Sequence, residues 1–137
     1  MSGPVLVDSN VLLDVATSDP KWAPWSEAAL AAAADEATLV INAIVYGEVS
    51  IGFVTKEELD AALPHDLFQR QDIPYEAAFL AGKCYIDYRR RGGARRSPLP
   101  DFYIGAHAAV AGYRLLTREV ARYKTYFPKL DLIAPTG

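Results

Sequence analysis

The chain has 137 residues, and its 51% hydrophobic and 23% charged content is typical of one globular domain rather than of a disordered chain. Its 14 basic and 17 acidic residues give a net charge of −3, so any contact with nucleic acid has to come from a local basic patch. The single cysteine, Cys84, excludes an internal disulfide and a cysteine-based zinc site. Because no leader-like or bilayer-length apolar segment is visible, we expect a soluble cytoplasmic protein without a membrane contact.

The first half of the chain alternates short apolar runs with helical segments. Residues 5–7 predict a buried strand, and a helix capped by Ser9 or Asn10 follows to residue 17. We expect an alanine-rich helix over 24–35, a strand over 38–41, and a helix from Asn42 to residue 53 that carries Glu48. Thr55 begins a further helix with the spacing of a capping box, and this helix ends near residue 63.

The second half continues the same alternation. It predicts a strand around 68–72, the longest helix over 74–91, a helix over 101–111, and strands over 114–117 and 132–134. Because strands of three to five residues alternate with helices, we expect an α/β fold with a central parallel sheet of four to five strands. No internal repeat or long linker divides residues 1–137, which therefore form a single predicted domain.

Four acidic residues stand out by their positions. Asp8 ends the first predicted strand, Glu119 lies two residues beyond the fourth, and Glu48 and Asp101 lie on predicted helices. In open parallel sheets, sites form beyond the carboxyl ends of the strands where the strand order reverses. Carboxylates from separate elements suit Mg²⁺ or Mn²⁺. Two carboxylates about 5 Å apart repel by about 3 kcal/mol at an effective dielectric of about 20, which favours a cation as the reason for such a cluster.

Each acid taken alone has a structural alternative. Asp8 and Asp101 could be helix N-caps, and Glu48 could be a solvent-facing helix residue. Glu119 could be a first-turn acid that the helix dipole favours. The spacing alone leaves the metal site and these alternatives open.

Four segments in this order resemble the PIN-domain family, and specifically the VapC-type toxins of bacterial toxin–antitoxin pairs. They are Asp8-Ser9-Asn10-Val11, the helical Glu48, the run from Pro100-Asp101 to Ala108, and Leu115-Leu116-Thr117-Arg118-Glu119 with the following residues 123–128. The resemblance extends from residue 5 to about residue 133. The fourth acid of the family is usually aspartate, and Glu119 departs from it by one methylene, or roughly 1.5 Å, where magnesium tolerates little error.

The resemblance implies a three-layer α/β/α PIN-like domain and a Mg²⁺- or Mn²⁺-dependent endoribonuclease that hydrolyses RNA phosphodiester bonds with metal-activated water. Such a protein is the toxin of a type II toxin–antitoxin pair, with a VapB-type antitoxin as partner and a homodimer as the common assembly. Asp8 and Asp101 would hold the ion, and Glu48 and Glu119 would ligate it or orient water. The supporting polar residues would be Ser9, Asn10 and Thr117.

Other polar and aromatic residues have two interpretations each. The arginines before the third acidic segment could contact RNA phosphates or form a solvated loop; they are Arg89, Arg90, Arg91, Arg95 and Arg96. Aromatic residues could stack on bases or belong to the core, namely Tyr85, Tyr88 and Tyr103. Trp22, Trp25 and Phe53 are candidates for an apolar surface that an antitoxin or second subunit covers. We expect His107 to be a surface or packed residue and His65 a loop residue.

Two rival functions remain to be distinguished. One is another Mg²⁺-dependent phosphoryl-transfer enzyme, such as a small phosphatase, although Ser9-Asn10 follows Asp8 where an aspartyl-phosphate enzyme has a second carboxylate two residues on. The other is a PIN-like module that the changed fourth acid has disabled, and that binds RNA or protein without cutting. RNA cleavage with Mg²⁺ or with chelator separates the nuclease from such a module.

Overall fold

The computed structural model of the chain describes residues 3–93 and 98–136. Within them five strands form one sheet in the order β3-β2-β1-β4-β5, and every neighbouring pair is parallel. The strands are β1 (Val5–Val7), β2 (Leu39–Ile41), β3 (Phe68–Arg70), β4 (Arg114–Leu116) and β5 (Leu132–Ile133). The predicted α/β fold with a parallel sheet is confirmed. The strands β1 and β2 are buried at every residue, as expected where helices cover both faces.

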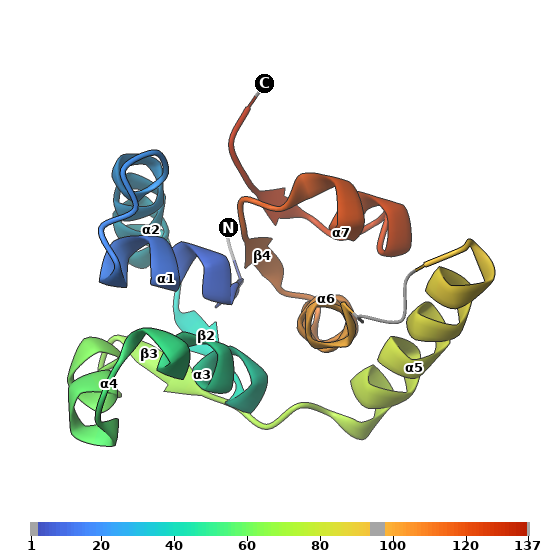
Figure 1. The fold of residues 1–137 in the computed structure, drawn as a ribbon, viewed down its shortest axis with the longest axis horizontal. Helices are drawn as coiled ribbons and strands as arrows, with labels where there is room; N and C mark the ends of the chain where they lie inside the picture. The colour runs from blue at the N-terminus through green and yellow to red at the C-terminus, as the bar shows by residue number, and fades with distance from the viewer. Residues whose placement is uncertain (1–2, 94–97, 137) are drawn as a thin grey trace.

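The helices connect the strands in two groups. The first three strands are joined through α1 (Ser9–Ala16), α2 (Ala23–Glu36), α3 (Ala43–Val49) and α4 (Lys56–Ala62). The crossing from β3 to β4 contains α5 (Tyr75–Arg90) and α6 (Leu99–Ala111), and α7 (Val120–Tyr126) precedes β5. Figure 1 shows α1 and α2 on one side of the strands and α6 and α7 on the other, which gives the three layers. None of the helices in the described ranges combines the length and apolar character that a membrane span requires.

Among the predicted boundaries that differ from the structure, three lie beside the acidic residues. Asp8, not Ser9 or Asn10, caps α1, because its carboxylate accepts a hydrogen bond from the backbone N–H of Ser9. The helix with Glu48 ends at Val49, and a 3₁₀ turn, η1 (Ser50–Gly52), follows it. Helix α6 begins at Leu99, two residues before the predicted start, with a proline in its first turn, and Asp101 lies within that turn. The capping box that begins α4 is confirmed.

The strand order reverses between β1 and β4. The chain moves from β1 through β2 to β3 on one side, then returns across β1 to place β4 and β5 on the other. Val7 is in register with Leu116, and the N–H of Asp8 donates to the carbonyl of Leu116 at 2.9 Å. The residues that follow, Asp8 and Thr117, therefore lie side by side at the carboxyl edge of the sheet, where open parallel sheets place their chemistry.

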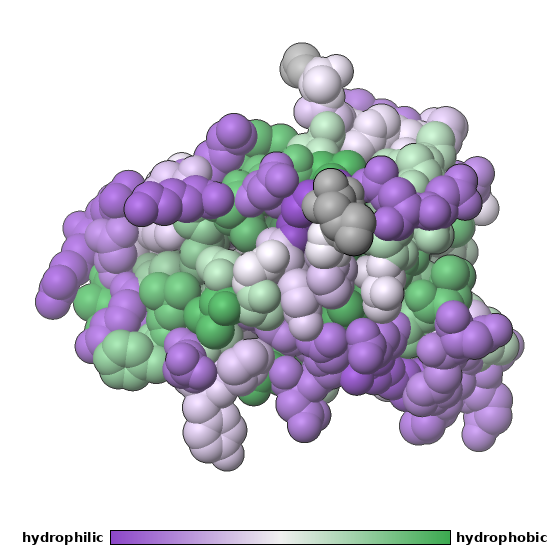
Figure 2. Space-filling view, turned by 180° about the vertical axis from the view of Figure 1, so that it is seen from behind, coloured by the Kyte–Doolittle hydropathy of each residue, from purple (hydrophilic) through white to green (hydrophobic). Residues whose placement is uncertain are grey.

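Helix α5 is buried on one face only. Ala77, Ala81 and Cys84 are buried, whereas Tyr75 and Phe79 are 92% and 68% exposed. Figure 2 shows hydrophobic and hydrophilic side chains intermingled on the face seen from behind. The exposed aromatic residues of α5 lie one turn apart, so they share one face of the helix.

Candidate metal centre

Three carboxylates meet at the carboxyl edge of the sheet. Asp8 at the end of β1, Glu48 on α3 and Asp101 in the first turn of α6 each offer one oxygen, and these oxygens lie within 4.8 Å of one another. Hard oxygen donors from three separate elements are what Mg²⁺ or Mn²⁺ requires. The fold thus brings together three of the four predicted acids, and this donor set fits a divalent cation.

Asp8 is buried and held by several donors. Its Oδ1 accepts the N–H of Ser9 at 2.7 Å, and its Oδ2 accepts the hydroxyl groups of Thr117 at 2.8 Å and Tyr123 at 3.0 Å and the amide of Asn10 at 3.3 Å. Burial and the negative charge of Asp101 nevertheless raise the pKa of Asp8 to about 6, against the opposing effect of these hydrogen bonds. The donors orient the carboxylate but leave its charge uncompensated, which also fits a cation.

Glu48 and Asp101 complete the cluster from two helices. The hydroxyl of Ser9 donates to Glu48 Oε1 at 2.6 Å, and burial raises the pKa of Glu48, with Asp101 adding to the effect. Asp101 accepts a hydrogen bond from Arg122 Nη1 on its Oδ2 at 2.6 Å. Burial also raises the pKa of Asp101, although Arg122 opposes this effect. All three carboxyl groups therefore have pKa values shifted in the direction that mutual repulsion and desolvation produce.

Glu119 lies at the start of α7, outside the group of three acids. It is the N-cap of α7, where its Oε2 accepts the N–H of Arg122 at 3.3 Å, and its own N–H donates to Thr117 Oγ1 at 3.0 Å. It does not belong to the group of three acids that could hold one ion in the described part of the chain. Its charge raises the pKa of Asp101, so it lies near the cluster without joining it. Glu119 is thus a capping residue, one position before the first turn in which the structural alternative placed it.

The predicted supporting residues all contact the cluster or its neighbours. Ser9 bridges Asp8 and Glu48, and Asn10 donates to both Asp8 Oδ2 and Thr117 Oγ1, the latter at 3.3 Å. The sequence did not single out Tyr123 or Arg122 as site residues. Both lie in the first turns of α7, three and four residues after its N-cap, and this helical spacing is the signal that could have placed them beside Glu119.

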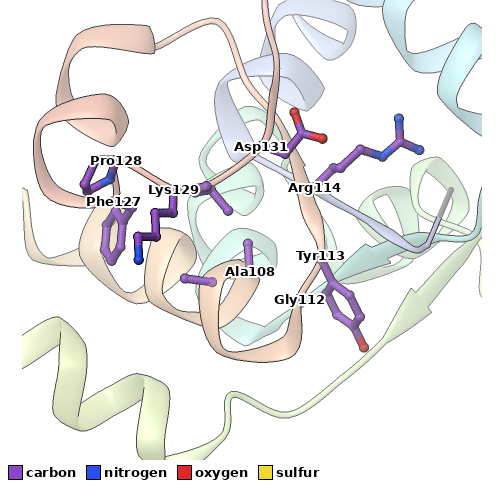
Figure 3. A pocket seen from close by; sticks show the side chains of 10 residues that line it. Ala108, Gly112, Tyr113, Arg114, Phe127, Pro128, Lys129 and Asp131 are labelled. Carbon is purple, nitrogen blue, oxygen red and sulfur yellow. The ribbon is translucent and has the colours of Figure 1, made fainter.

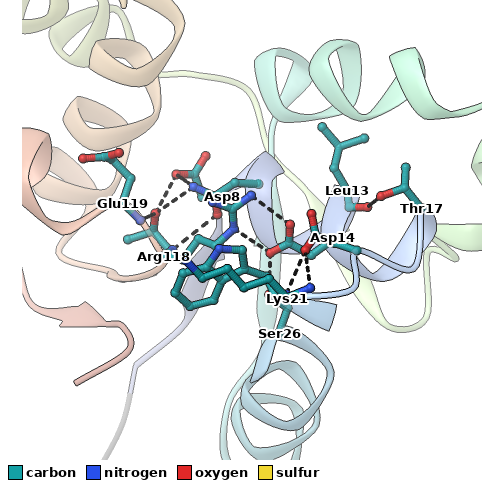
Figure 4. Close-up of polar contacts among 12 residues, drawn as sticks. Asp8, Leu13, Asp14, Thr17, Lys21, Ser26, Arg118 and Glu119 are labelled. Atoms are coloured by element: carbon teal, nitrogen blue, oxygen red, sulfur yellow. Dashed lines mark hydrogen bonds and ion pairs between the residues drawn. The ribbon is translucent and has the colours of Figure 1, made fainter. Parts of the chain in front are cut away.

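The loop before α7 is fixed by a partly buried ion pair, shown in Figure 4. Arg118 donates to both carboxylate oxygens of buried Asp14, at 2.7 and 2.9 Å, and Ser26 Oγ donates to the same carboxylate at 2.8 Å. The guanidinium also lies 5.3 Å from the ring centroid of Trp22. These contacts join α1 and α2 to the segment that carries Thr117. Trp22, a candidate for the predicted apolar surface, is half-buried and packs against this cation.

The arginines and aromatic residues before α6 are only partly described. Arg89, Arg90 and Arg91 are exposed at the end of α5, whereas Arg95 and Arg96 lie outside the described residues. Tyr88 packs edge-on against Phe102 with ring centroids 5.9 Å apart, as in the predicted core alternative. The other two tyrosines are half-buried and pack against the core, namely Tyr85 and Tyr103.

The two histidines lie away from the acids. His107 is buried on α6, where its Nδ1 pairs with the side-chain amide of Asn42 at 2.9 Å, so of the two expected places the packed one is observed. Burial lowers the pKa of His107. Asn42 also caps α3, the helix of Glu48, by accepting the N–H of Val45 at 3.0 Å. His65 lies in a turn, as predicted.

Two clefts lie away from the acids. One of about 400 Å³ surrounds the end of α6 and the start of β4, at the opposite edge of the sheet, and Lys129 extends into it between Phe127 and Ala108 (Figure 3). The other, of about 320 Å³, is lined by apolar residues of α1, α2, α4 and the adjoining segments, including Phe53. Of the three residues predicted for an apolar surface, Phe53 lines this cleft, and Trp25 is half-buried against the core.

Comparison with known proteins agrees with this geometry. The family model of the PIN domain matches residues 5–127, so the chain belongs to the PIN-domain family. Similar solved structures include VapBC2 from Rickettsia felis bound to a promoter DNA fragment, with 20% identity over 97% of this chain and 99% of that one and a TM-score of 0.72. VapBC-1 from nontypeable Haemophilus influenzae has 18% identity over 96% and 97% and a TM-score of 0.70. A toxin–antitoxin complex from Klebsiella pneumoniae has 21% identity over 94% and 95% and a TM-score of 0.65. No curated protein sequence matches the chain significantly.

Proposed function

We propose that this chain is a metal-dependent endoribonuclease of the VapC type, the toxin of a type II toxin–antitoxin pair. The observation that carries the proposal is the meeting of Asp8, Glu48 and Asp101 within 4.8 Å at the point where the strand order reverses. Membership of the PIN-domain family and the likeness to VapBC toxin–antitoxin structures support it. The intact triad favours a nuclease over a disabled binding module.

The proposed roles follow from the contacts. Asp8 and Asp101 would hold Mg²⁺ or Mn²⁺, and Glu48, fixed by the Ser9 hydroxyl, would orient the attacking water. The bound ion would lower the pKa of that water and offset charge on the phosphate. Thr117, Asn10 and Tyr123 hold the Asp8 carboxylate in place. Glu119 supports the site from outside by capping α7 and adding negative charge beside Asp101.

The proposed partners are RNA and a VapB-type antitoxin. The exposed arginines at the end of α5 would contact RNA phosphates. Such a local basic patch is needed because the chain has a net charge of −3. The apolar cleft between α1, α2 and α4 is a suitable surface for an antitoxin segment. The exposed aromatic face of α5 is a suitable surface for the predicted homodimer.

The test is RNA cleavage by the purified chain freed of any antitoxin. We expect total RNA to be cut with Mg²⁺ or Mn²⁺ and to stay intact with chelator. Asp8→Asn and Asp101→Asn should each lower the rate by at least about 10²-fold, as loss of a metal ligand does. The control is Asp35→Asn on α2, which removes an exposed acid outside the cluster and should cut at the normal rate. RNA that binds but is not cut by the normal chain would favour the disabled module.

A further inference from the structure

Arg122 is the cation in direct contact with the acidic cluster. Its Nη1 lies 2.6 Å from Asp101 Oδ2, and within residues 3–93 and 98–136 no other basic side chain hydrogen-bonds to Asp8, Glu48 or Asp101. The pair is half-exposed, with 35% of the Arg122 side chain and 24% of the Asp101 side chain accessible. Solvent can therefore reach part of the Arg122 side chain.

The backbone of Arg122 is fixed by α7, whereas its side chain is held by a single ion pair. Its N–H donates to Glu119 Oε2 in the first turn of α7, and the adjacent Tyr123 is buried and bonded to Asp8. The neighbouring Arg118 shows the opposite arrangement, with two hydrogen bonds to the buried Asp14 and a ring contact with Trp22. The guanidinium of Arg118 is therefore fixed by two hydrogen bonds to Asp14. The guanidinium of Arg122 contacts the acidic cluster through one atom, Nη1, and only its backbone is fixed within α7.

From this geometry we infer that Arg122 exchanges partners: it neutralises Asp101 when no metal is bound, and it contacts an RNA phosphate once a metal ion has taken Asp101. The inference rests on the proposed metal-dependent function. A divalent cation bound to Asp101 would repel a guanidinium on the same carboxylate, so the two compete for it. The released guanidinium stays at the edge of the site, and its planar set of N–H donors matches the oxygens of a phosphate.

The first experiment measures metal binding rather than cleavage. The dissociation constant for Mg²⁺ is determined by calorimetry for the normal chain, Arg122→Gln and Arg122→Lys. Removing the competing charge should make Arg122→Gln bind Mg²⁺ about tenfold more tightly, with Arg122→Lys closer to the normal chain. The matched control is Arg70→Gln, because Arg70 forms a similar half-exposed ion pair with Asp60, with exposures of 31% and 32%, outside the cluster. The dissociation constant of Arg70→Gln for Mg²⁺ should equal that of the normal chain.

The second experiment measures the phosphate contact. Binding of a fluorescent single-stranded RNA oligonucleotide is followed with Ca²⁺ in place of Mg²⁺, so that the RNA is not consumed. Arg122→Gln should bind it several-fold more weakly, with a salt dependence reduced by about one phosphate contact, whereas Arg70→Gln should not differ from the normal chain.

The outcomes separate the inference from the proposed function. If the normal chain binds neither Mg²⁺ nor, in the same titration, Mn²⁺, the proposed function fails. If it binds Mg²⁺ and Arg122→Gln binds it equally or more weakly, the exchange is wrong and the nuclease proposal stands. Unchanged RNA affinity in Arg122→Gln would likewise overturn the phosphate contact. Should that variant fail to fold, the side-chain NMR signals of Arg122 in the normal chain, assigned with Arg122→Lys, must shift on adding Mg²⁺, and signals that do not move would refute the exchange.

Discussion

At the scale of single residues, the site depends on how one carboxylate is held. Asp8 caps α1 and also faces Glu48 and Asp101, so its structural role and its proposed role as a metal ligand fall on one side chain. The two interpretations of this residue from sequence are therefore compatible. The strand-end position of Asp8 was predictable from a short apolar run, but the hydroxyl of Tyr123 on its Oδ2 was not. That contact depends on how α7 packs, which no local pattern encodes.

The Tyr123 hydroxyl gives the first prediction. Tyr123→Phe removes a donor to Asp8 Oδ2, so the pKa of Asp8 should rise further above about 6, and the pH at which Mg²⁺ affinity is half lost should rise with it. Calorimetry over a pH series measures this midpoint. Tyr126→Phe, which alters an aromatic cluster on the same helix, is the control. A midpoint that stays the same in Tyr123→Phe would show that the hydroxyl does not affect the ionisation of Asp8.

Glu119 supplies a second prediction at this scale. As the N-cap of α7 it should tolerate replacement by aspartate, which is a favourable N-cap residue, so Glu119→Asp should unfold at the same or higher urea concentration. Its Mg²⁺ affinity should remain within about twofold of normal, because Glu119 lies outside the three-acid group. A clear gain in metal affinity or cleavage rate in Glu119→Asp would instead show that Glu119 is a metal ligand whose side chain is too long.

At the scale of elements, helix ends position the acids. Asn42 caps α3 and also pairs with buried His107 on α6, so one side chain sets the helix that carries Glu48 against the helix that carries Asp101. The sequence predicted the cap, since Asn42 follows an apolar run. It could not predict the pairing with His107, because the two residues are 65 positions apart and the contact exists only once both helices pack.

Loss of both contacts of Asn42 should lower the free energy of unfolding measurably. Asn42→Ala removes the cap and leaves His107 Nδ1 without its partner, so the free energy of unfolding should fall by about 2–3 kcal/mol. Thr55→Ala, which removes the exposed capping box of α4, should cost only about 1 kcal/mol. Urea unfolding with chelator present measures both. Equal losses in the two variants would mean that the pairing with His107 adds nothing.

At the scale of the whole molecule, the parallel sheet was predictable because strand-length apolar runs alternate with helical segments along the entire chain. The reversal of strand order was not, since it depends on long crossings that local patterns do not describe. The resemblance to a known family implied the three layers, and the strand order became known only from the structure. The fold concentrates like charges at one edge of the sheet, and its stability should therefore depend on pH and on metal.

The raised pKa of Asp8 sets the sign of the pH dependence of stability. The pKa of Asp8 is raised from 3.8 to about 6 by folding, so the folded chain binds more protons than the unfolded chain in this interval. Without metal, the contribution of Asp8 to the free energy of unfolding should fall as the pH rises from about 4 to about 6. With saturating Mg²⁺, the metal's stabilising effect should grow over the same interval, because protons compete with the ion. Urea titrations of the normal chain and Asp8→Asn measure the difference, and a difference that does not vary with pH would contradict the prediction.

The pairing of β1 with β4 has a consequence for synthesis of the protein. Val5 pairs with Arg114, so the strand made first cannot complete its place in the sheet until more than 100 further residues have been joined. Asp8 likewise receives its Thr117 and Tyr123 hydrogen bonds only after those residues have left the ribosome. A nascent chain therefore has no assembled site. The proposed nuclease would thus stay inactive, by its own topology, while its messenger is still being translated.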